Sequence, residues 1–241
     1  MCSEDHVELS SRKCPDKDTR GTPSTILSVN KRWACVASIK DPQYFPRVEE
    51  GQSPRILWIG CSDSRVLEAD ITVTRPGDVF VHRNIASQFQ PTDDNALAVL
   101  EYSVKYLRIR DVVIVGHKNC GGVIAAFEAA FPSCRGEIDE KVSDGVHIEP
   151  VDGSERSGSS YQSALSRWLV PLATRLGSLM PPVTLEHAHE ENVRIQVENL
   201  LTLRQDILGW SEGHAVRIHG WLYDFSTGIV RHMVTEHMGP E

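Results

Sequence analysis

Three side chains that bind soft metals follow two apolar segments of the sequence. Cys61 comes directly after the segment 55–60, and His117 and Cys120 follow the segment 111–116. Short apolar runs bounded by Gly or Pro are typical of buried strands, and open α/β sheets bind ligands beyond the carboxyl ends of their strands. If these two strands are neighbours, two thiolates and one imidazole converge, and that donor set favours zinc.

The number of ligands indicates which kind of zinc site this is. Three protein ligands leave a fourth position for water, which distinguishes a catalytic site from a closed structural one. A structural site would need a further ligand, and Cys134, fourteen residues after Cys120, is the only nearby candidate. We therefore expect a catalytic site, in which zinc acidifies a bound water and supplies a hydroxide nucleophile near neutral pH.

Asp63 and Arg65 follow Cys61 by two and four residues. A carboxylate beside the metal accepts a hydrogen bond from the zinc-bound hydroxide, and a bidentate arginine fixes and ionises that carboxylate. Asp63 is also able to bind zinc itself, which would displace the water and switch the site off. Gly121 and Gly122 begin a predicted helix, so their backbone N–H groups suit a small anion.

Strands that alternate with helices predict an α/β fold with a central, mostly parallel sheet flanked by helices. The predicted strands span residues 55–60, 78–82, 111–116, 216–223 and 228–233, and predicted helices span 23–39, 121–130, 161–176 and 185–208. A further helix, capped by Thr92 or Asp93, is predicted from the face that carries Leu97, Leu100, Val104 and Leu107. The short connection 224–227 predicts a hairpin and therefore an antiparallel edge strand. We expect a flexible N-terminal arm at 1–21, then one domain at 22–241 that begins with a helical arm. The polar stretch 135–160 is predicted to be a loop or insertion.

Composition excludes several classes of protein. The 241 residues carry 25 Lys and Arg against 33 Asp and Glu, a net charge of −8, whereas proteins that bind the phosphate backbone are normally basic, so we expect no nucleic-acid partner. The apolar runs are far shorter than the roughly 20 residues of a membrane span, so we expect no membrane association.

The acidic start, with Glu4, Asp5 and Glu8, lacks the apolar core of an export signal. This predicts a cytoplasmic protein, or a mitochondrial one if a presequence was removed. The cysteines outside the zinc site are predicted to be free thiols: Cys2, Cys14, Cys35 and Cys134.

The two halves of the site together resemble a known family. The sequences Cys-Ser-Asp-Ser-Arg at 61–65 and His-x-x-Cys-Gly-Gly at 117–122 are similar to those of the β-class carbonic anhydrases. The intervening Arg-Pro-Gly-Asp at 75–78 and Phe-Val-His-Arg-Asn at 80–84 also match. The likeness is close over 25–130 and looser over 185–235.

The resemblance implies reversible hydration of carbon dioxide to bicarbonate, with zinc on Cys61, His117 and Cys120 and with Asp63 and Arg65 as an orienting dyad. It also implies a homodimer or homotetramer in which the amino-terminal helix covers a neighbouring subunit. By position, the substrate pocket would include Gln52, Phe80 and Tyr106 besides Gly121 and Gly122, with a partner subunit supplying part of it.

Some bacterial members of the family bind bicarbonate at a regulatory site and hold the aspartate on zinc in a closed form. Trp58, Arg83 and Tyr223 match that site, and Gly60 and Val66 fit the same subgroup. The resemblance thus implies a switch that responds to pH and bicarbonate. The alternative is structural: a core tryptophan and tyrosine, and a surface ion pair at Arg83.

Two other functions remain open from the sequence. The same fold and zinc ligands would also suit a hydrolase of carbonyl sulfide or carbon disulfide, and Gln52 and Tyr106 favour the anhydrase over it. A zinc-bearing binding protein without turnover is the third reading, which the presence of both Asp63 and Arg65 disfavours. The scattered histidines, with His187 and His189 near a helix start, share no ligand spacing, so we expect no second metal.

Overall fold

A computed structural model describes residues 21–134, 145–148, 163–180 and 183–239. The chain divides after Gln52 into two compact units. The predicted arm at 1–21 lies almost wholly outside the described residues, and so does the stretch 135–160, apart from 145–148. The prediction that 22–241 forms one domain stays a prediction.

The first unit contains the helices α1 (Pro23–Lys40) and α2 (Tyr44–Glu49). Thr22 caps α1 and Pro23 occupies its first turn, as expected for a helix start. No residue of α1 is buried, and Ile26, Leu27 and Trp33 expose 55%, 65% and 48% of their surface. The predicted helix at 23–39 is confirmed, and its apolar side chains lie at the surface of this unit.

Cys35 on α1 corrects one expectation. It is disulfide-bonded, so the prediction of a free thiol is wrong there, because pairing depends on distances in space that spacing along the chain does not reveal. The prediction is confirmed for Cys134, which is free. Cys2 and Cys14 lie outside the described residues.

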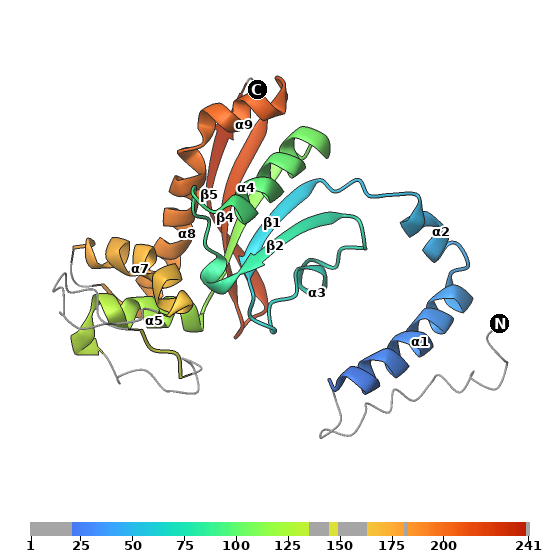
Figure 1. Ribbon diagram of the computed structural model, residues 1–241, viewed down its shortest axis with the longest axis horizontal. Helices are drawn as coiled ribbons and strands as arrows, with labels where there is room; N and C mark the ends of the chain where they lie inside the picture. The colour runs from blue at the N-terminus through green and yellow to red at the C-terminus, as the bar shows by residue number, and fades with distance from the viewer. Residues whose placement is uncertain (1–20, 135–144, 149–162, 181–182, 240–241) are drawn as a thin grey trace. The chain divides into compact units, whose positions relative to one another are not determined.

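The second unit is built on a five-stranded sheet with the order β2-β1-β3-β4-β5 (Figure 1). Its strands are β1 (Ile56–Cys61), β2 (Val79–Asn84), β3 (Asp111–His117), β4 (Val216–Asp224) and β5 (Ile229–Met238). The pairs β1–β2, β1–β3 and β3–β4 are parallel, and β4–β5 is an antiparallel hairpin. The predicted fold class and the antiparallel edge strand are both confirmed.

The remaining helices are α3 (Glu68–Thr72), α4 (Asp94–Glu101), α5 (Gly121–Ala130), α7 (Ala164–Gly177), α8 (Leu185–Leu201) and α9 (Arg204–Ser211). A π-helical turn at Tyr102–Tyr106 continues α4. The predicted helix at 185–208 is two helices, because the backbone leaves the helical conformation at Leu203. This break lets Leu200 and Ile207 both reach the core.

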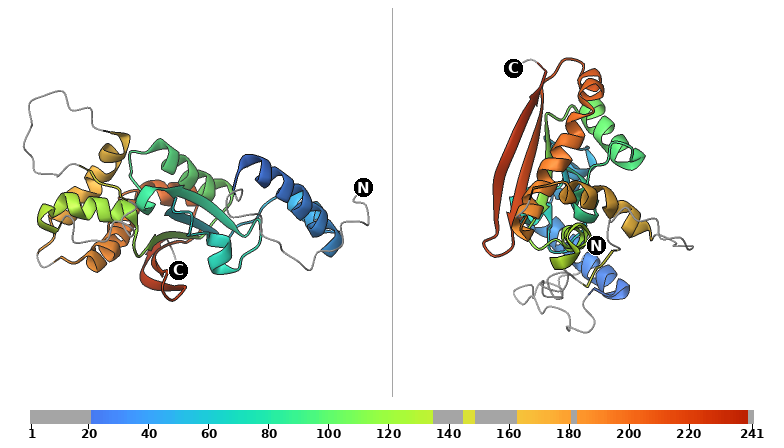
Figure 2. Two further views of the ribbon diagram at one scale, coloured as in Figure 1. Left: turned by 90° about the horizontal axis from the view of Figure 1, so that it is seen from below. Right: turned by 90° about the vertical axis from the view of Figure 1, so that its left-hand side faces the viewer.

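Helices cover one face of the sheet (Figure 2). Apolar side chains of α4, α8 and α9 pack there against Leu57, Ile59 and Ile114. The opposite face carries a smaller cluster around Trp58 and Val113. No helix that the structure describes is long and apolar enough to cross a membrane.

The strand order explains where a ligand would bind. β1 has the sequential neighbour β2 on one side and β3 on the other, so the order reverses beside β1. Open α/β sheets bind ligands at such a point, beyond the carboxyl ends of the strands. Helices α5 and α7 pack together at this end of the unit.

Candidate metal centre and active site

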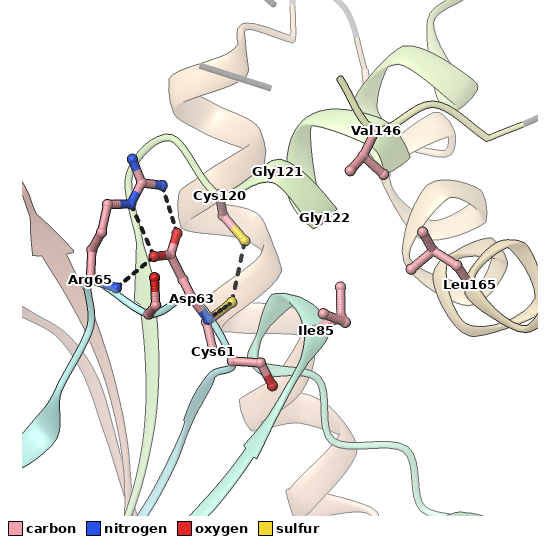
Figure 3. Close-up of a pocket in the computed structure, with 11 residues that line it drawn as sticks. Cys61, Asp63, Arg65, Ile85, Cys120, Gly121, Gly122, Val146 and Leu165 are labelled. Atoms are coloured by element: carbon pink, nitrogen blue, oxygen red, sulfur yellow. Dashed lines mark hydrogen bonds and ion pairs between the residues drawn. The ribbon is translucent and has the colours of Figure 1, made fainter. Parts of the chain in front are cut away.

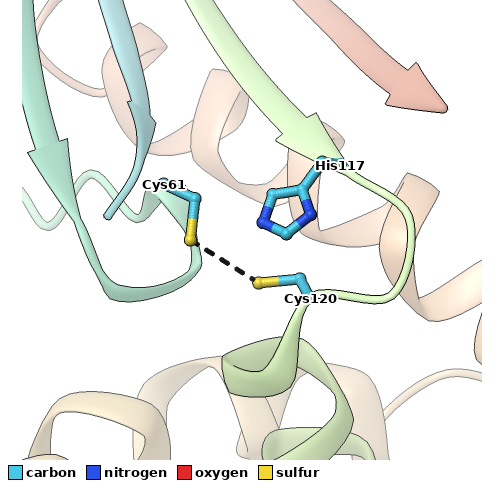
Figure 4. Close-up of side chains that lie close together, drawn as sticks. All are labelled: Cys61, His117 and Cys120. Atoms are coloured by element: carbon cyan, nitrogen blue, oxygen red, sulfur yellow. Dashed lines mark hydrogen bonds between the residues drawn. The ribbon is translucent and has the colours of Figure 1, made fainter. Parts of the chain in front are cut away.

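Three buried ligand side chains meet where β1 and β3 end (Figure 4). Cys61 is the last residue of β1, His117 is the last residue of β3, and Cys120 is the N-cap of α5. Their ligand atoms all lie within 4.8 Å of one another, and the three residues are 2% to 4% exposed. The predicted convergence of these three residues is confirmed. Cys134 is not part of this ligand group.

His117 presents an unused nitrogen to the two sulfurs. Its Nδ1 lies 2.9 Å from the Lys118 carbonyl oxygen, which fixes Nδ1 as the protonated nitrogen, since a carbonyl only accepts. Its buried Nε2 has no hydrogen-bond partner among the described residues. Buried polar atoms are almost always paired, and a metal-binding histidine typically donates its other N–H to an acceptor. The ring therefore fits a metal at Nε2.

The two thiols lie close together, with 3.8 Å between their Sγ atoms. The hydrogen bond from Cys120 outweighs burial and lowers the pKa of Cys61 to about 4. The same hydrogen bond, followed by burial, raises the pKa of Cys120 above its ordinary value. A metal that binds both sulfurs must displace the remaining proton, so metal affinity falls as pH falls.

His189, which the sequence analysis sets aside among the scattered histidines, lies beside the ligand group. Its Nε2 accepts a hydrogen bond of 3.1 Å from the backbone N–H of Cys120, and its Nδ1 lies 2.8 Å from the Leu185 carbonyl oxygen. Burial lowers the pKa of His189 to about 4, so the ring is neutral and able to accept. The sequence did contain a signal for its burial. His189 lies four residues before Val193 and therefore falls on the buried face of α8.

Asp63 and Arg65 form the predicted pair beside the ligands. Arg65 donates from Nε at 3.0 Å and from Nη2 at 2.6 Å to the two carboxylate oxygens, and its backbone N–H donates at 2.9 Å. These hydrogen bonds lower the pKa of Asp63. The Oδ2 atom lies 3.9 Å from Nε2 of His117. In this arrangement the carboxylate is ionised and is held by Arg65 at the rim of the ligand group.

Phe225, which directly follows β4, and Arg83, on β2, contact this loop. The Phe225 ring lies 4.6 Å beneath the Arg65 guanidinium and meets the His117 ring edge-on at 5.1 Å. Arg83 donates to the carbonyl oxygens of Cys61 at 2.8 Å and Asp63 at 2.6 Å. We did not predict a role for Phe225, although it directly follows a strand that ends at the same edge.

A cavity of about 410 Å³ opens beside the ligand group (Figure 3). Its lining residues are Cys61, Ser62, Asp63, Ser64, Arg65, Ile85, Cys120, Gly121, Gly122, Val146 and Leu165. Gly121 and Gly122 thus lie where the sequence predicts them. A Cβ on Gly122 would come within 2.8 Å of Ile85 Cγ2, so the start of α5 approaches the cavity wall only without a side chain.

Phe80 and Tyr106, which the resemblance places in the substrate pocket, do not line this cavity. Phe80 stacks on Tyr102 at 5.7 Å between ring centroids, and Tyr102 contacts Tyr106 at 5.6 Å. Tyr106 is 63% exposed. Neither Phe80 nor Tyr106 is among the described residues that line the cavity. Gln52 belongs to the first unit, and its role in a pocket stays a prediction.

Trp58, Arg83 and Tyr223 project from one face of the sheet, as their strand registers require. Trp58 and Tyr223 belong to the apolar cluster on that face. Gly60 makes room for the indole, because a Cβ there would lie 2.3 Å from Trp58 Nε1. Val66 is buried in the same cluster. This placement is compatible with both the regulatory and the structural interpretation.

The carbonic anhydrase family model matches residues 56–230. The chain belongs to the β-class carbonic anhydrase family. A carbonic anhydrase of Emericella nidulans is 27% identical over 95% of this chain and 91% of the relative. A tetrameric β-carbonic anhydrase of Sordaria macrospora is 31% identical, covers 88% of this chain and 98% of its own, and has a TM-score of 0.65. A Coccomyxa β-carbonic anhydrase in complex with acetazolamide is 26% identical, covers 90% and 88%, and has a TM-score of 0.68.

Membership of the family has direct consequences. The chain is an enzyme of the lyase class, and the general reaction of carbonic anhydrases is the hydration of carbon dioxide. The β-class enzymes depend on a metal, and the Cys61, His117 and Cys120 group is able to hold one. The cavity beside this group is therefore the candidate active site.

Proposed function

We propose that this enzyme hydrates carbon dioxide reversibly to bicarbonate and a proton, with zinc held by Cys61, His117 and Cys120. The observation that carries the proposal is the buried, unpartnered Nε2 of His117, which faces two buried sulfurs beside the cavity. Two sulfurs and one nitrogen favour zinc, and three ligands leave room for water. Zinc bound there would lower the pKa of a water ligand to about 7, a value that belongs to a carbonic anhydrase with three histidine ligands.

Asp63 and Arg65 act as the orienting dyad in this proposal. The ionised carboxylate has no proton to donate, so it accepts one hydrogen bond from the attacking water and aligns its lone pair with the substrate. Arg65 holds both carboxylate oxygens and keeps Asp63 away from the ligand position. If Asp63 left Arg65 and bound a metal at this site, it would take the position of the water and the enzyme would be inactive.

Carbon dioxide and bicarbonate place different demands on the cavity. Gly121 and Gly122 line the cavity at the start of α5, where the positive end of the helix dipole would favour an anion. Bicarbonate is stabilised there, whereas uncharged carbon dioxide needs no such donor.

Arg83 offers a route by which bicarbonate would regulate the site. It donates to the carbonyl oxygens of Cys61 and Asp63. An anion that binds its guanidinium would compete with these two hydrogen bonds and so loosen the loop that carries Asp63. In this proposal Trp58 and Tyr223 complete the anion site. An enzyme that keeps its full rate at low pH and high bicarbonate would contradict it.

We also propose a homodimer or a homotetramer. The Sordaria relative is described as tetrameric, and α1 exposes several large apolar side chains that a second copy would cover. Sedimentation across a dilution series should show a dimer or a tetramer, with the rate falling as it dissociates. A monomer with normal turnover would contradict this proposal.

The direct test is the rate of carbon dioxide hydration per bound zinc from about pH 7 to about pH 9, which brackets the pKa of zinc-bound water. A high rate throughout supports hydration with Asp63 on Arg65. A rate that appears only at the alkaline end supports Asp63 on the metal at lower pH. Zinc binding without hydration would overturn the proposal and favour the carbonyl sulfide hydrolase or the binding protein.

A further inference from the structure

The active-site cavity has two unlike walls (Figure 3). Asp63 and Arg65 stand on one side, and Val146 and Leu165 stand opposite, with Ile85 beside them. The apolar wall offers no hydrogen bond, so it suits an uncharged, apolar molecule such as carbon dioxide rather than bicarbonate.

Two members of this wall are fixed to one another through Trp168. Its indole N–H donates to the Ile85 carbonyl oxygen at 2.9 Å. Leu165 lies three residues earlier on the same helix, α7, so both side chains occupy neighbouring positions on one helix face. Helix α7 therefore links Leu165, which packs against the cluster of α5 and α7, to the backbone of Ile85.

Val146 is held differently, because it belongs to the short described segment 145–148. Its neighbour His147 pairs through Nδ1 with Oε2 of Glu128 at 2.9 Å. Its other neighbour, Ile148, is 4% exposed and packs in the cluster between α5 and α7. One hydrogen-bonded side chain and one buried side chain thus flank Val146.

Glu128 is an unusual residue at its position. It is 2% exposed, and the other nine residues of α5 are Gly, Ala, Val, Ile or Phe. A buried carboxylate is costly unless it is paired, and an apolar residue of similar volume often serves packing as well or better. The specific contribution of this carboxylate is its contact with His147.

We propose that Glu128 and His147 are a positioning pair that holds Val146 as the third side chain of an apolar wall for carbon dioxide. The inference rests on the proposed function and assigns a role to residues from the polar insertion. Val146 is a specificity-determining residue in this account, because its side chain sets how tightly the wall fits a small linear substrate.

The test compares zinc-loaded wild type with Val146→Ala, Glu128→Leu and Glu128→Gln. Val146→Ala and Glu128→Leu should raise KM for carbon dioxide up to about tenfold, with zinc content unchanged. The value of kcat should stay within about twofold, because the wall binds the substrate and the transition state equally well. Glu128→Gln keeps an acceptor for His147 and should remain near wild type. Glu198→Leu is the matched control, since it removes an exposed ion pair with Arg175.

Three further measurements do not depend on turnover. Hydrogen exchange of the metal-free protein should speed up at 145–148 in Glu128→Leu and not in Glu198→Leu. The His147 side chain is 44% exposed and stays solvated without Glu128, so the melting temperature of Glu128→Leu should stay near that of the wild type. The bulkier Val146→Phe should weaken acetazolamide by at least about tenfold by calorimetry, while azide, which is small, keeps its affinity.

The outcomes separate the two proposals. An unchanged KM in Val146→Ala and unchanged exchange in Glu128→Leu, in an enzyme whose wild type hydrates carbon dioxide, would overturn this inference alone. Zinc-loaded wild type without hydration would overturn the proposed function, while the exchange result would still report on the positioning pair.

Discussion

A histidine lies at each end of strand β3, but the two differ in their hydrogen bonds. At the amino end, Asp111 binds Arg217 at 2.6 and 2.7 Å and His219 at 2.9 Å, and His219 reaches Thr235 at 2.8 Å. At the carboxyl end, the Nε2 atom of His117 has no described hydrogen-bond partner. A fully paired polar cluster needs no ligand, whereas a buried nitrogen left unpaired beside two thiols indicates a missing atom. Pairing, more than residue type, separates the structural cluster from the metal site.

The largest effect should come from removing ligands at the carboxyl end. His117→Ala and Cys61→Ser should abolish stoichiometric zinc and lower the hydration rate by at least about 1000-fold, since both the metal and its water are lost. Metal analysis and stopped-flow hydration check this. The matched control at the amino end is His219→Ala, which should keep its zinc and most of its rate. Loss of zinc in His219→Ala would contradict the distinction between a structural cluster at the amino end and a metal site at the carboxyl end.

Asp63→Asn should have the next largest effect. The amide keeps the size of the side chain but loses the charge that Arg65 stabilises, so we expect full zinc content with a rate about 100-fold lower. Full activity in this variant would remove the dyad from the mechanism. Asp111→Asn, the same substitution at the amino end of β3, should leave the rate per zinc unchanged.

His189 should have a smaller effect, on metal affinity. His189→Phe removes the acceptor for the Cys120 N–H and should weaken zinc binding about tenfold. His189→Gln can still accept this hydrogen bond and should lose less. Competition with a chelator of known affinity measures both. Equal losses in the two variants would show that packing, rather than the hydrogen bond, is what His189 contributes.

The smallest expected effect is on stability at the amino end. Burial acts to raise the pKa of Asp111, but the hydrogen bonds from Arg217 and His219 outweigh it and lower the pKa. A lowered carboxyl pKa gives stability that is present above the unfolded value of about 3.9 and is lost as pH falls below it. Denaturant unfolding should therefore show Asp111→Asn about 1 kcal/mol less stable at pH 7, with this gap closing toward pH 3. A gap independent of pH would contradict the assigned cause.

The sequence predicts the ligand group well because its residues are fixed by strand ends. Cys61 and His117 end neighbouring parallel strands, so their convergence follows from topology. His189 and Val146 were missed because long-range packing places them: His189 approaches Cys120 from α8, 69 residues away, and Val146 comes from a polar stretch without periodicity. The break at Leu203 was missed because the apolar spacing continues across it.

The central claim is that Cys61, His117 and Cys120 form one catalytic zinc site per chain. Stepwise addition of zinc to the metal-free enzyme, with zinc content and hydration rate followed together, tests it most directly. The account predicts a rate that rises in proportion to bound zinc and reaches its plateau at about one zinc per chain, with Cys61→Ser flat throughout. Full hydration before zinc is added, or a plateau unchanged in Cys61→Ser, would contradict the account.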